Sequence, residues 1–230
     1  MDQIKEHLLE ELQNPVAFTI PVLGGVPVSE SVVVSWVIMA VLVVASLLLT
    51  RKLQIRHPGK AQLALEMAVE FLNHFTEDTM GKRGRSFAPW LGTVALYILC
   101  SNIIGIFGFI PPTKDINITA ALAVMSALLI YGAQFRYHGL GGGLKKFAQP
   151  LPLLLPINLM EIVIRPLALC MRLFGNILGA FIIMELIKML VPVVVPVPFS
   201  IYFDLFDGGI QAVVFVFLTA LFTGESIKEE

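Results

Sequence analysis

The chain has 230 residues and a formal net charge of −1, and 57% of its residues are hydrophobic whereas only 14% are charged. A soluble domain usually has about a quarter of its residues charged, so this composition excludes an ordinary soluble protein and favours a membrane protein. The balanced charge gives no indication of a nucleic-acid partner, and both cysteines lie in apolar segments, which argues against a disulfide framework.

The N-terminal part predicts an outer segment, one membrane span and one surface helix. Residues 1–30 are acidic at their start, and no basic region precedes an apolar stretch, so we expect no cleavable signal peptide. Segment 31–50 carries no charge and is long enough to cross a hydrocarbon core of about 30 Å. Segment 61–80 alternates apolar and polar residues at helical spacing, which predicts an amphipathic helix at the membrane surface.

Two more spans are predicted in the middle of the chain, at 87–110 and 116–137. The sequence Pro-Pro-Thr-Lys-Asp separates them at 111–115. The glycine-rich stretch 139–146 lacks the Gly-Lys-Ser/Thr ending of a phosphate loop, so we expect a flexible loop there.

The last two spans are predicted at 156–190 and 199–224. A helix of about 35 residues would be about 52 Å long, so we expect the first of them to be strongly tilted or to extend beyond the bilayer. The proline-rich stretch 191–198 is not expected to be regular helix. The sequence thus predicts an all-α integral membrane protein, a single membrane domain over 1–230 with five spans whose last two helices are long and tilted.

Orientation is predicted from the loops, because Lys and Arg gather on the cytoplasmic side of a membrane. Ten of these residues fall on one side of the predicted spans, which places the N-terminus outside and the C-terminus in the cytoplasm. They are Arg51, Lys52, Arg56, Lys60, Lys82, Arg83, Arg85, Arg136, Lys145 and Lys146.

Ionisable residues concentrate in the last two spans, whereas the first three spans have almost none. A charge at the bilayer centre costs about 2.5–3.5 kcal/mol on insertion scales, so seven such residues indicate ion transport. They are Glu161, Arg165, Arg172, Glu185, Lys188, Asp204 and Asp207. For Arg165 and Lys188, which lie nearer the helix ends, extension toward the membrane surface is an equal alternative.

Arg172 lies near the middle of its span on a polar face that small residues flank. The residues within about 40° of it on a helical wheel are Glu161, Arg165, Asn176 and Gly179, and Gly175 and Gly179 have the spacing of a helix-packing motif. A guanidinium cannot lose its proton in a protein, so Arg172 can attract a carboxylate and repel free cations but cannot relay protons. A structural pair with Glu161 is the alternative. On the last span, Asp204, Asp207 and Gln211 are spaced by three and four residues and are expected to share a face.

Three segments of the chain resemble subunit a of the F-type ATP synthases. They are Asn158-Leu-Met-Glu161 with Arg165-Pro-Leu-Ala-Leu-Cys-Met-Arg172-Leu-Phe-Gly-Asn176, then Pro111-Pro-Thr-Lys-Asp115-Ile-Asn117-Ile-Thr119, and Gln211-Ala-Val-Val-Phe. The resemblance implies a non-catalytic proton-conducting stator of the Fo sector, with no cofactor, no metal and no nucleotide site. The partners it implies are a ring of c subunits, the b subunits of the peripheral stalk, the remainder of the complex and membrane lipid.

The resemblance also implies roles for single residues. Arg172 would separate two offset half-channels that lead to the ring carboxylate, with Asn176 and Gln211 lining its surroundings. Many similar sequences have Glu or His at the position of Phe181, so the outer half-channel is expected to differ here. We expect Glu185 to replace that residue and to form the outer path together with Asp204 and Asp207. The alternative is that Glu185 only pairs with Lys188. Glu161, Arg165, Gly175 and Gly179 would support the site from further away.

Three other functions compete with this one. An independent secondary cation transporter commonly has internal repeats, and none is visible here. A Na⁺-coupled version of the same subunit would have the same signature. A structural scaffold would leave the membrane-embedded Arg172 and Asp204 unexplained.

Overall fold

The computed structural model describes residues 16–20, 26–51, 53–54, 59–146, 153, 155–190 and 196–228. Five helical segments in this part are long and apolar enough to cross a membrane, which confirms the predicted all-α membrane fold. They are Glu30–Thr50, Lys82–Phe107, Ile116–Gly139, Leu155–Met189 and Pro198–Ile227. The predicted tilt of the last two helices refers to a bilayer and stays a prediction.

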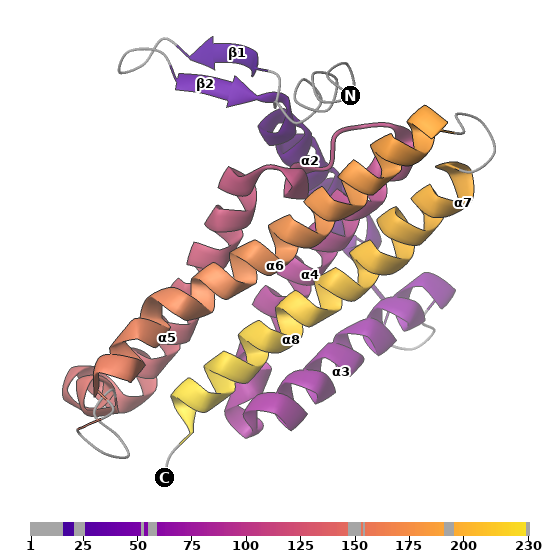
Figure 1. The fold of residues 1–230 in the computed structure, drawn as a ribbon. Coiled ribbons are helices and arrows are strands. Elements are labelled where there is room, and N and C mark those ends of the chain that lie inside the picture. Colours follow the sequence, from indigo (N-terminus) through magenta and orange to yellow (C-terminus); the bar gives the residue numbers. More distant parts are fainter. Residues whose placement is uncertain are drawn as a thin grey trace. The chain divides into compact units, whose positions relative to one another are not determined.

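The elements in chain order are two strands followed by a series of helices (Figure 1). They are β1 (Val16–Ile20), β2 (Val26–Ser29), α2 (Glu30–Thr50), α3 (Lys60–Met80), η1 (Lys82–Phe87), α4 (Ala88–Ile103), η2 (Ile104–Phe107), η3 (Pro112–Lys114), α5 (Ile116–Lys146), α6 (Leu155–Leu190), α7 (Pro196–Ser200), the π-helix η5 (Ile201–Asp207) and α8 (Gly208–Ile227).

The chain divides into two compact units, and most long helices contribute to both. The first unit takes residues 1–43, 97–119 and 172–212, and the second takes 44–96, 120–171 and 213–230. The prediction of a single membrane domain therefore stays a prediction, and each unit is described by itself.

In the first unit, the chain before α2 forms an antiparallel hairpin of β1 and β2 (Figure 1). The sequence analysis did not predict these strands inside the N-terminal segment. The Ser29 hydroxyl at the end of β2 donates a hydrogen bond to Asp115 Oδ2 at 2.9 Å. The other oxygen of Asp115 accepts from the backbone N–H of Asn117 at 2.9 Å, so the carboxylate also caps the start of α5. Asp115 thereby joins the hairpin to the turn before α5.

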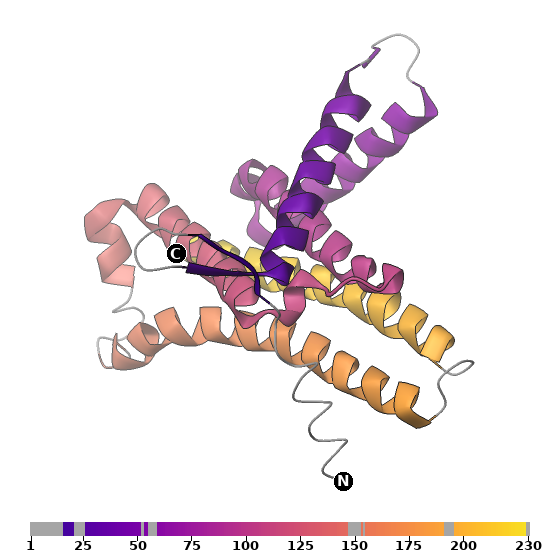
Figure 2. The same ribbon diagram turned by 90° about the horizontal axis from the view of Figure 1, so that it is seen from above.

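Also in the first unit, the part of α6 from 172 onward runs beside α7 and η5 in both Figure 1 and Figure 2. Two sequence expectations are wrong here. In the stretch 191–198, which was not expected to be regular helix, residues 191–195 lie outside the described residues, and 196–198 belong to helix α7, because proline is tolerated in a first helical turn. Residues 201–207 form a π-helix rather than a regular α-helix, and the Gly208 N–H donates to the carbonyls of Phe203 and Leu205.

In the second unit, α3 packs against α4 and the end of α8. The rings of Phe75 and Phe217 lie 6.2 Å apart between their centroids, and a side chain at Gly92 would collide with Leu72 of α3. The predicted surface helix 61–80 is therefore helical as expected. Its exposed apolar side chains include Met67 and Phe71.

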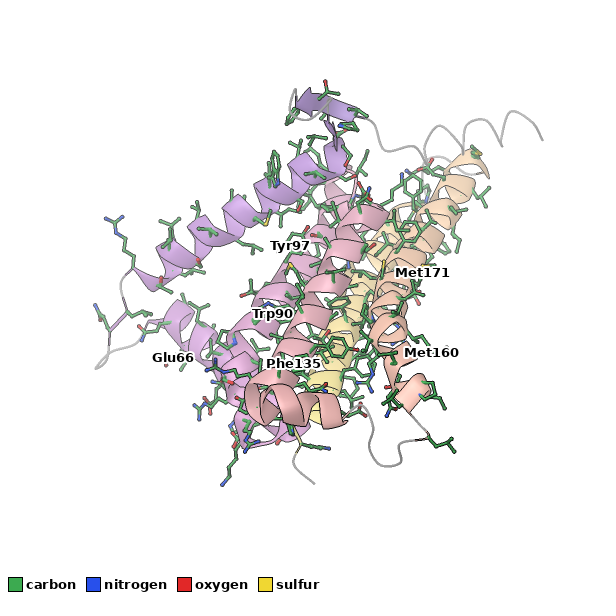
Figure 3. All side chains as sticks on the ribbon, turned by 90° about the vertical axis from the view of Figure 1, so that its left-hand side faces the viewer. Glu66, Trp90, Tyr97, Phe135, Met160 and Met171 are labelled. Atoms are coloured by element: carbon green, nitrogen blue, oxygen red, sulfur yellow. The ribbon has the colours of Figure 1, made fainter. Side chains whose placement is uncertain are left out.

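The expectation of a loop at 139–146 is also wrong, because α5 continues to Lys146 after a kink at Gly139. Gly139 has φ +70°, a left-handed conformation that favours glycine. The Gln134 side-chain amide donates to the Gly143 carbonyl at 2.8 Å, and a side chain at Gly143 would overlap the ring of Phe135 (labelled in Figure 3). These contacts hold the part of α5 after the kink against the part before it.

Many large apolar side chains are exposed on the described spans, as expected of helices that face lipid. On α6, Met160 is 61% exposed and Met171 is 50% exposed (Figure 3), and α2 exposes Trp36 and a series of valines and leucines.

Candidate functional site

Arg172 is exposed on α6, in the first unit. Within the described part of the chain, no carboxylate lies within 4 Å of its guanidinium, so the alternative pair with Glu161 is not formed. Gly175 is exposed too, and a side chain placed at Gly175 or at Gly179 would meet no atom within 4 Å. The guanidinium therefore lies on a face that another helix could approach closely.

Gln211 of α8 is brought to the same face by Asn176, which lies one helical turn after Arg172. The Asn176 amide donates to Gln211 Oε1 at 2.7 Å. Gln211 is 3% exposed, and its Nε2 has no hydrogen-bond partner within the described residues. A buried donor without a partner costs about 1–3 kcal/mol, so this amide group is an unsatisfied polar group inside the first unit.

Arg165 belongs to the second unit and forms an ion cluster there. Its Nη2 lies 2.5 Å from Glu161 Oε2 and 3.2 Å from Glu225 Oε2, and its guanidinium carbon lies 4.9 Å from the centroid of the Phe222 ring. Arg165 therefore pairs within the chain instead of only extending to the membrane surface. The sequence analysis missed Glu225, although an acid near the end of the last span was visible in the sequence.

A cavity of about 630 Å³ lies within the first unit, between the second half of α6, the segment from η2 to Lys114, and α7 with η5. Glu185 and Asp204 both line it, so the structure brings together two of the three acids that were grouped from the sequence. Asp207 is not among the lining residues. The reason is that η5 is a π-helix with wider turns than an α-helix, which changes the spacing that places two residues on one face.

Asp204 is held at the cavity by Ser200 and by a close approach to η2. The Ser200 hydroxyl donates to Asp204 Oδ2 at 2.7 Å. A side-chain carbon placed on Gly105 would lie 3.0 Å from Asp204 Oδ1, so glycine is what allows η2 to come this near the carboxylate.

Asn102 connects the segments around the cavity. Its Nδ2 donates to the Gly208 carbonyl at 2.9 Å, and its Oδ1 accepts from the Thr113 hydroxyl at 2.7 Å. Asn102 is 2% exposed, and a side-chain carbon on Gly208 would lie only 2.6 Å from Asn102 Cβ. The pair therefore sets how closely the start of α8 approaches α4.

Glu185 both lines the cavity and forms an ion pair. Its Oε1 lies 2.6 Å from the Nζ of Lys188, and its side chain is 11% exposed against 51% for the lysine. The ion pair of Glu185 with Lys188, which was the alternative in the sequence analysis, is thus present, and Glu185 lines the cavity at the same time.

Lys114 is a further cavity residue that the sequence analysis did not single out. It is 4% exposed, and its Nζ lies 3.4 Å from the centroid of the Phe181 ring. A desolvated cation over an aromatic face gains about 2 kcal/mol. The only sequence signal for this residue is a lysine in a turn on the side of the membrane that has few basic residues.

Two comparisons with known proteins identify the family of this chain. The family described as ATP synthase A chain matches residues 32–224. The chain is also similar to ATP synthase subunit a from Moorella thermoacetica, with 37% identity over 198 residues that cover 86% of this chain and 90% of that protein. The chain therefore belongs to the subunit a family of the ATP synthase Fo membrane sector.

Proposed function

We propose that this chain is the proton-conducting stator of a rotary ATP synthase and couples proton flow to rotation of a c-subunit ring. The observation that carries the proposal is Arg172, a permanent cation at membrane depth that faces outward beside Gly175 and Gly179. A buried or paired arginine would serve structure, whereas this one is placed to meet a charge on another protein.

The partner charge would be the carboxylate of a passing c subunit. At about 4 Å and an effective dielectric of about 20, its attraction to Arg172 is about 4 kcal/mol, which favours the ionised carboxylate. The carboxyl group would release its proton toward one side, pass Arg172 as an anion, and take a proton from the other side. Gln211 would support this step by holding the side chain of Asn176, which is exposed one helical turn after Arg172, through the hydrogen bond that Asn176 donates to it.

The outer half-channel of this proposal runs through the cavity. The distribution of Lys and Arg predicts that the segments around this cavity lie at the outer side of a bacterial inner membrane, opposite to the cytoplasmic C-terminus. Glu185 and Asp204 would hold and pass protons in turn, and Asp207 would connect them further along η5. The chain itself would bind no nucleotide, and the b subunits would hold it against rotation.

The test is purification of the complex in native lipid followed by reconstitution into vesicles. A stator copurifies with a c ring and soluble ATPase subunits, and ATP added to the vesicles drives proton uptake that depends on Arg172. The competing secondary transporter would instead support flux as an isolated chain. Flux by the isolated chain, without the other subunits, would exclude the stator function.

A further inference from the structure

We propose that a water molecule binds between Ser31 of α2 and Ser101 of α4, and that this buried hydration site holds α2 to the rest of the first unit. The inference goes beyond the proposed function and does not depend on it. It assigns a role to two serines that neither the sequence motifs nor the cavity requires.

The first observation is which side chains of α2 are buried. Helix α2 has 21 residues, and the three that are buried are Ser31, Ser35 and Ile38. Two of these three are serines, whereas many of the large apolar side chains of α2 are exposed. Lipid tails are as apolar as leucine, so membrane helices associate through close packing of small residues and through hydrogen bonds between polar side chains. The attachment of α2 is therefore expected to depend on its serine hydroxyl groups.

The second observation is that two of the buried hydroxyl groups have no partner. Ser31 and Ser101 are both 0% exposed, and the Oγ of each makes no hydrogen bond within the described part of the chain. Other buried hydroxyl groups donate to a carbonyl of their own helix, as Thr219 does to Phe215 at 2.9 Å. Ser31 has no such carbonyl, because it is the second residue of α2 and Pro27, four residues earlier, belongs to β2. Ordered water commonly satisfies buried groups of this kind.

The third observation is that two hydrogen bonds place these serines at the same level. The hydroxyl oxygens of Ser35 and Tyr97 (labelled in Figure 3) lie 2.6 Å apart. Ser29, just before α2, donates to Asp115, which follows α4 in the chain. The order of these contacts shows that α2 and α4 run antiparallel within the first unit. The two serines without a partner each lie one helical turn from the Ser35–Tyr97 pair, in the direction of the Ser29–Asp115 contact.

The lengths of the side chains favour a water bridge over a direct hydrogen bond. Tyrosine is much longer than serine, so the helix separation that suits the bond of Ser35 with Tyr97 holds two serines too far apart to bond directly. A water molecule donates and accepts hydrogen bonds, as each hydroxyl group does, so one water can bond to both. Buried waters usually make roughly two to four hydrogen bonds, and two hydroxyl groups meet this requirement.

The first test is a density map of the whole complex in native lipid, at a resolution that shows ordered water. We expect a peak about 2.5–3.0 Å from the Oγ atoms of both Ser31 and Ser101. A map that shows ordered water elsewhere in the chain but none between these two atoms overturns the inference. A direct hydrogen bond between the two serines overturns it as well. This test uses the unmodified chain, so it does not depend on how well any variant folds.

The second test measures the midpoint of thermal unfolding of the full chain in detergent. The variants are Ser31→Ala, Ser101→Ala and the double variant. Ser86→Ala is the matched control, because Ser86 is an exposed serine of η1. Each single variant is expected to lower the midpoint by about 2–4 °C, since the water loses one of its two partners and the other serine is left unsatisfied. The control should unfold at the temperature of the wild type.

The double variant separates the water bridge from two independent contacts. Replacing both partners of a buried hydrogen bond by apolar groups is nearly neutral, so Ser31→Ala with Ser101→Ala should unfold no lower than either single variant. Losses that add fully in the double variant overturn the inference. So does an unchanged or raised midpoint in either single variant, because removing a hydroxyl group that truly has no partner would not destabilise the chain.

Discussion

At the scale of single residues, two arginines that the sequence places on the same helical face have different surroundings in the described structure. Arg165 and Arg172 share one predicted helical face, yet Arg165 contacts Glu161 and Glu225 whereas Arg172 faces outward without a carboxylate within 4 Å among the described residues. Sequence spacing predicted the shared face, because that depends only on helical geometry. It could not predict Glu225 as a partner, because that contact joins two helices.

We expect Arg172→Lys to abolish ATP-driven proton pumping. A lysine in an apolar contact can lose its proton and lacks the planar fork of guanidinium, so up to about 4 kcal/mol of attraction to a ring carboxylate is lost, or about a thousandfold in rate. Arg85→Lys, an exposed residue of η1, is the control and should pump normally. Normal pumping by Arg172→Lys in reconstituted vesicles would refute the proposed role.

The pair of Asn176 and Gln211 leads to a second prediction at this scale. Gln211→Leu should reduce pumping only partly, because the charge of Arg172 remains. Since the two side chains share a hydrogen bond of 2.7 Å, the effects of Gln211→Leu and Asn176→Leu should not add in the double variant. Pumping rates of the two single variants and the double variant measure this coupling. Fully additive losses would show that the two residues act independently.

At the scale of elements, hydrophobic length predicted the five spans well, because a helix that crosses a membrane needs a long apolar run. The predictions failed where the backbone departs from a regular helix. Each of these departures is accompanied by a contact between separate segments: Asn102 with Gly208 after the π-helix η5, Gln134 with Gly143 after the kink at Gly139, and Ser29 of the hairpin with Asp115. Such contacts join segments whose proximity cannot be read from local sequence.

The close approach at Gly208 predicts a loss of stability on substitution. In Gly208→Ala the new carbon would lie 2.6 Å from Asn102 Cβ, an atom too near the backbone to move aside, so α4 and α8 must separate. We expect a destabilisation of about 1–3 kcal/mol, measured as a lower midpoint of thermal unfolding in detergent. Gly132→Ala, where the added carbon meets no atom within 4 Å, is the matched control and should unfold at the same temperature or slightly higher. Equal midpoints for the two variants would contradict the close contact.

At the scale of the whole molecule, the proposed proton route uses parts of the chain that are far apart in sequence. The cavity takes Lys114 from one connection, Glu185 from α6 and Asp204 from η5. The acids could be grouped from the sequence because charges inside apolar spans are conspicuous. The cavity and the buried lysine could not be predicted, because they arise from packing between these segments.

The last prediction compares how much each of the two acids of the cavity contributes to proton flux through the complete synthase. Glu185 is paired with Lys188 at 2.6 Å, whereas Asp204 accepts a hydrogen bond from the neutral Ser200 hydroxyl at 2.7 Å. We therefore expect Asp204→Asn to stop proton flux in vesicles and Glu185→Gln to slow it, with the double variant no worse than Asp204→Asn alone, since residues in series on one path do not add. Lys188→Gln tests whether the ion pair itself matters: it should change flux less than Glu185→Gln does. If Glu185→Gln leaves flux unchanged while Asp204→Asn stops it, Glu185 is structural and the outer path runs along η5 and α8 only.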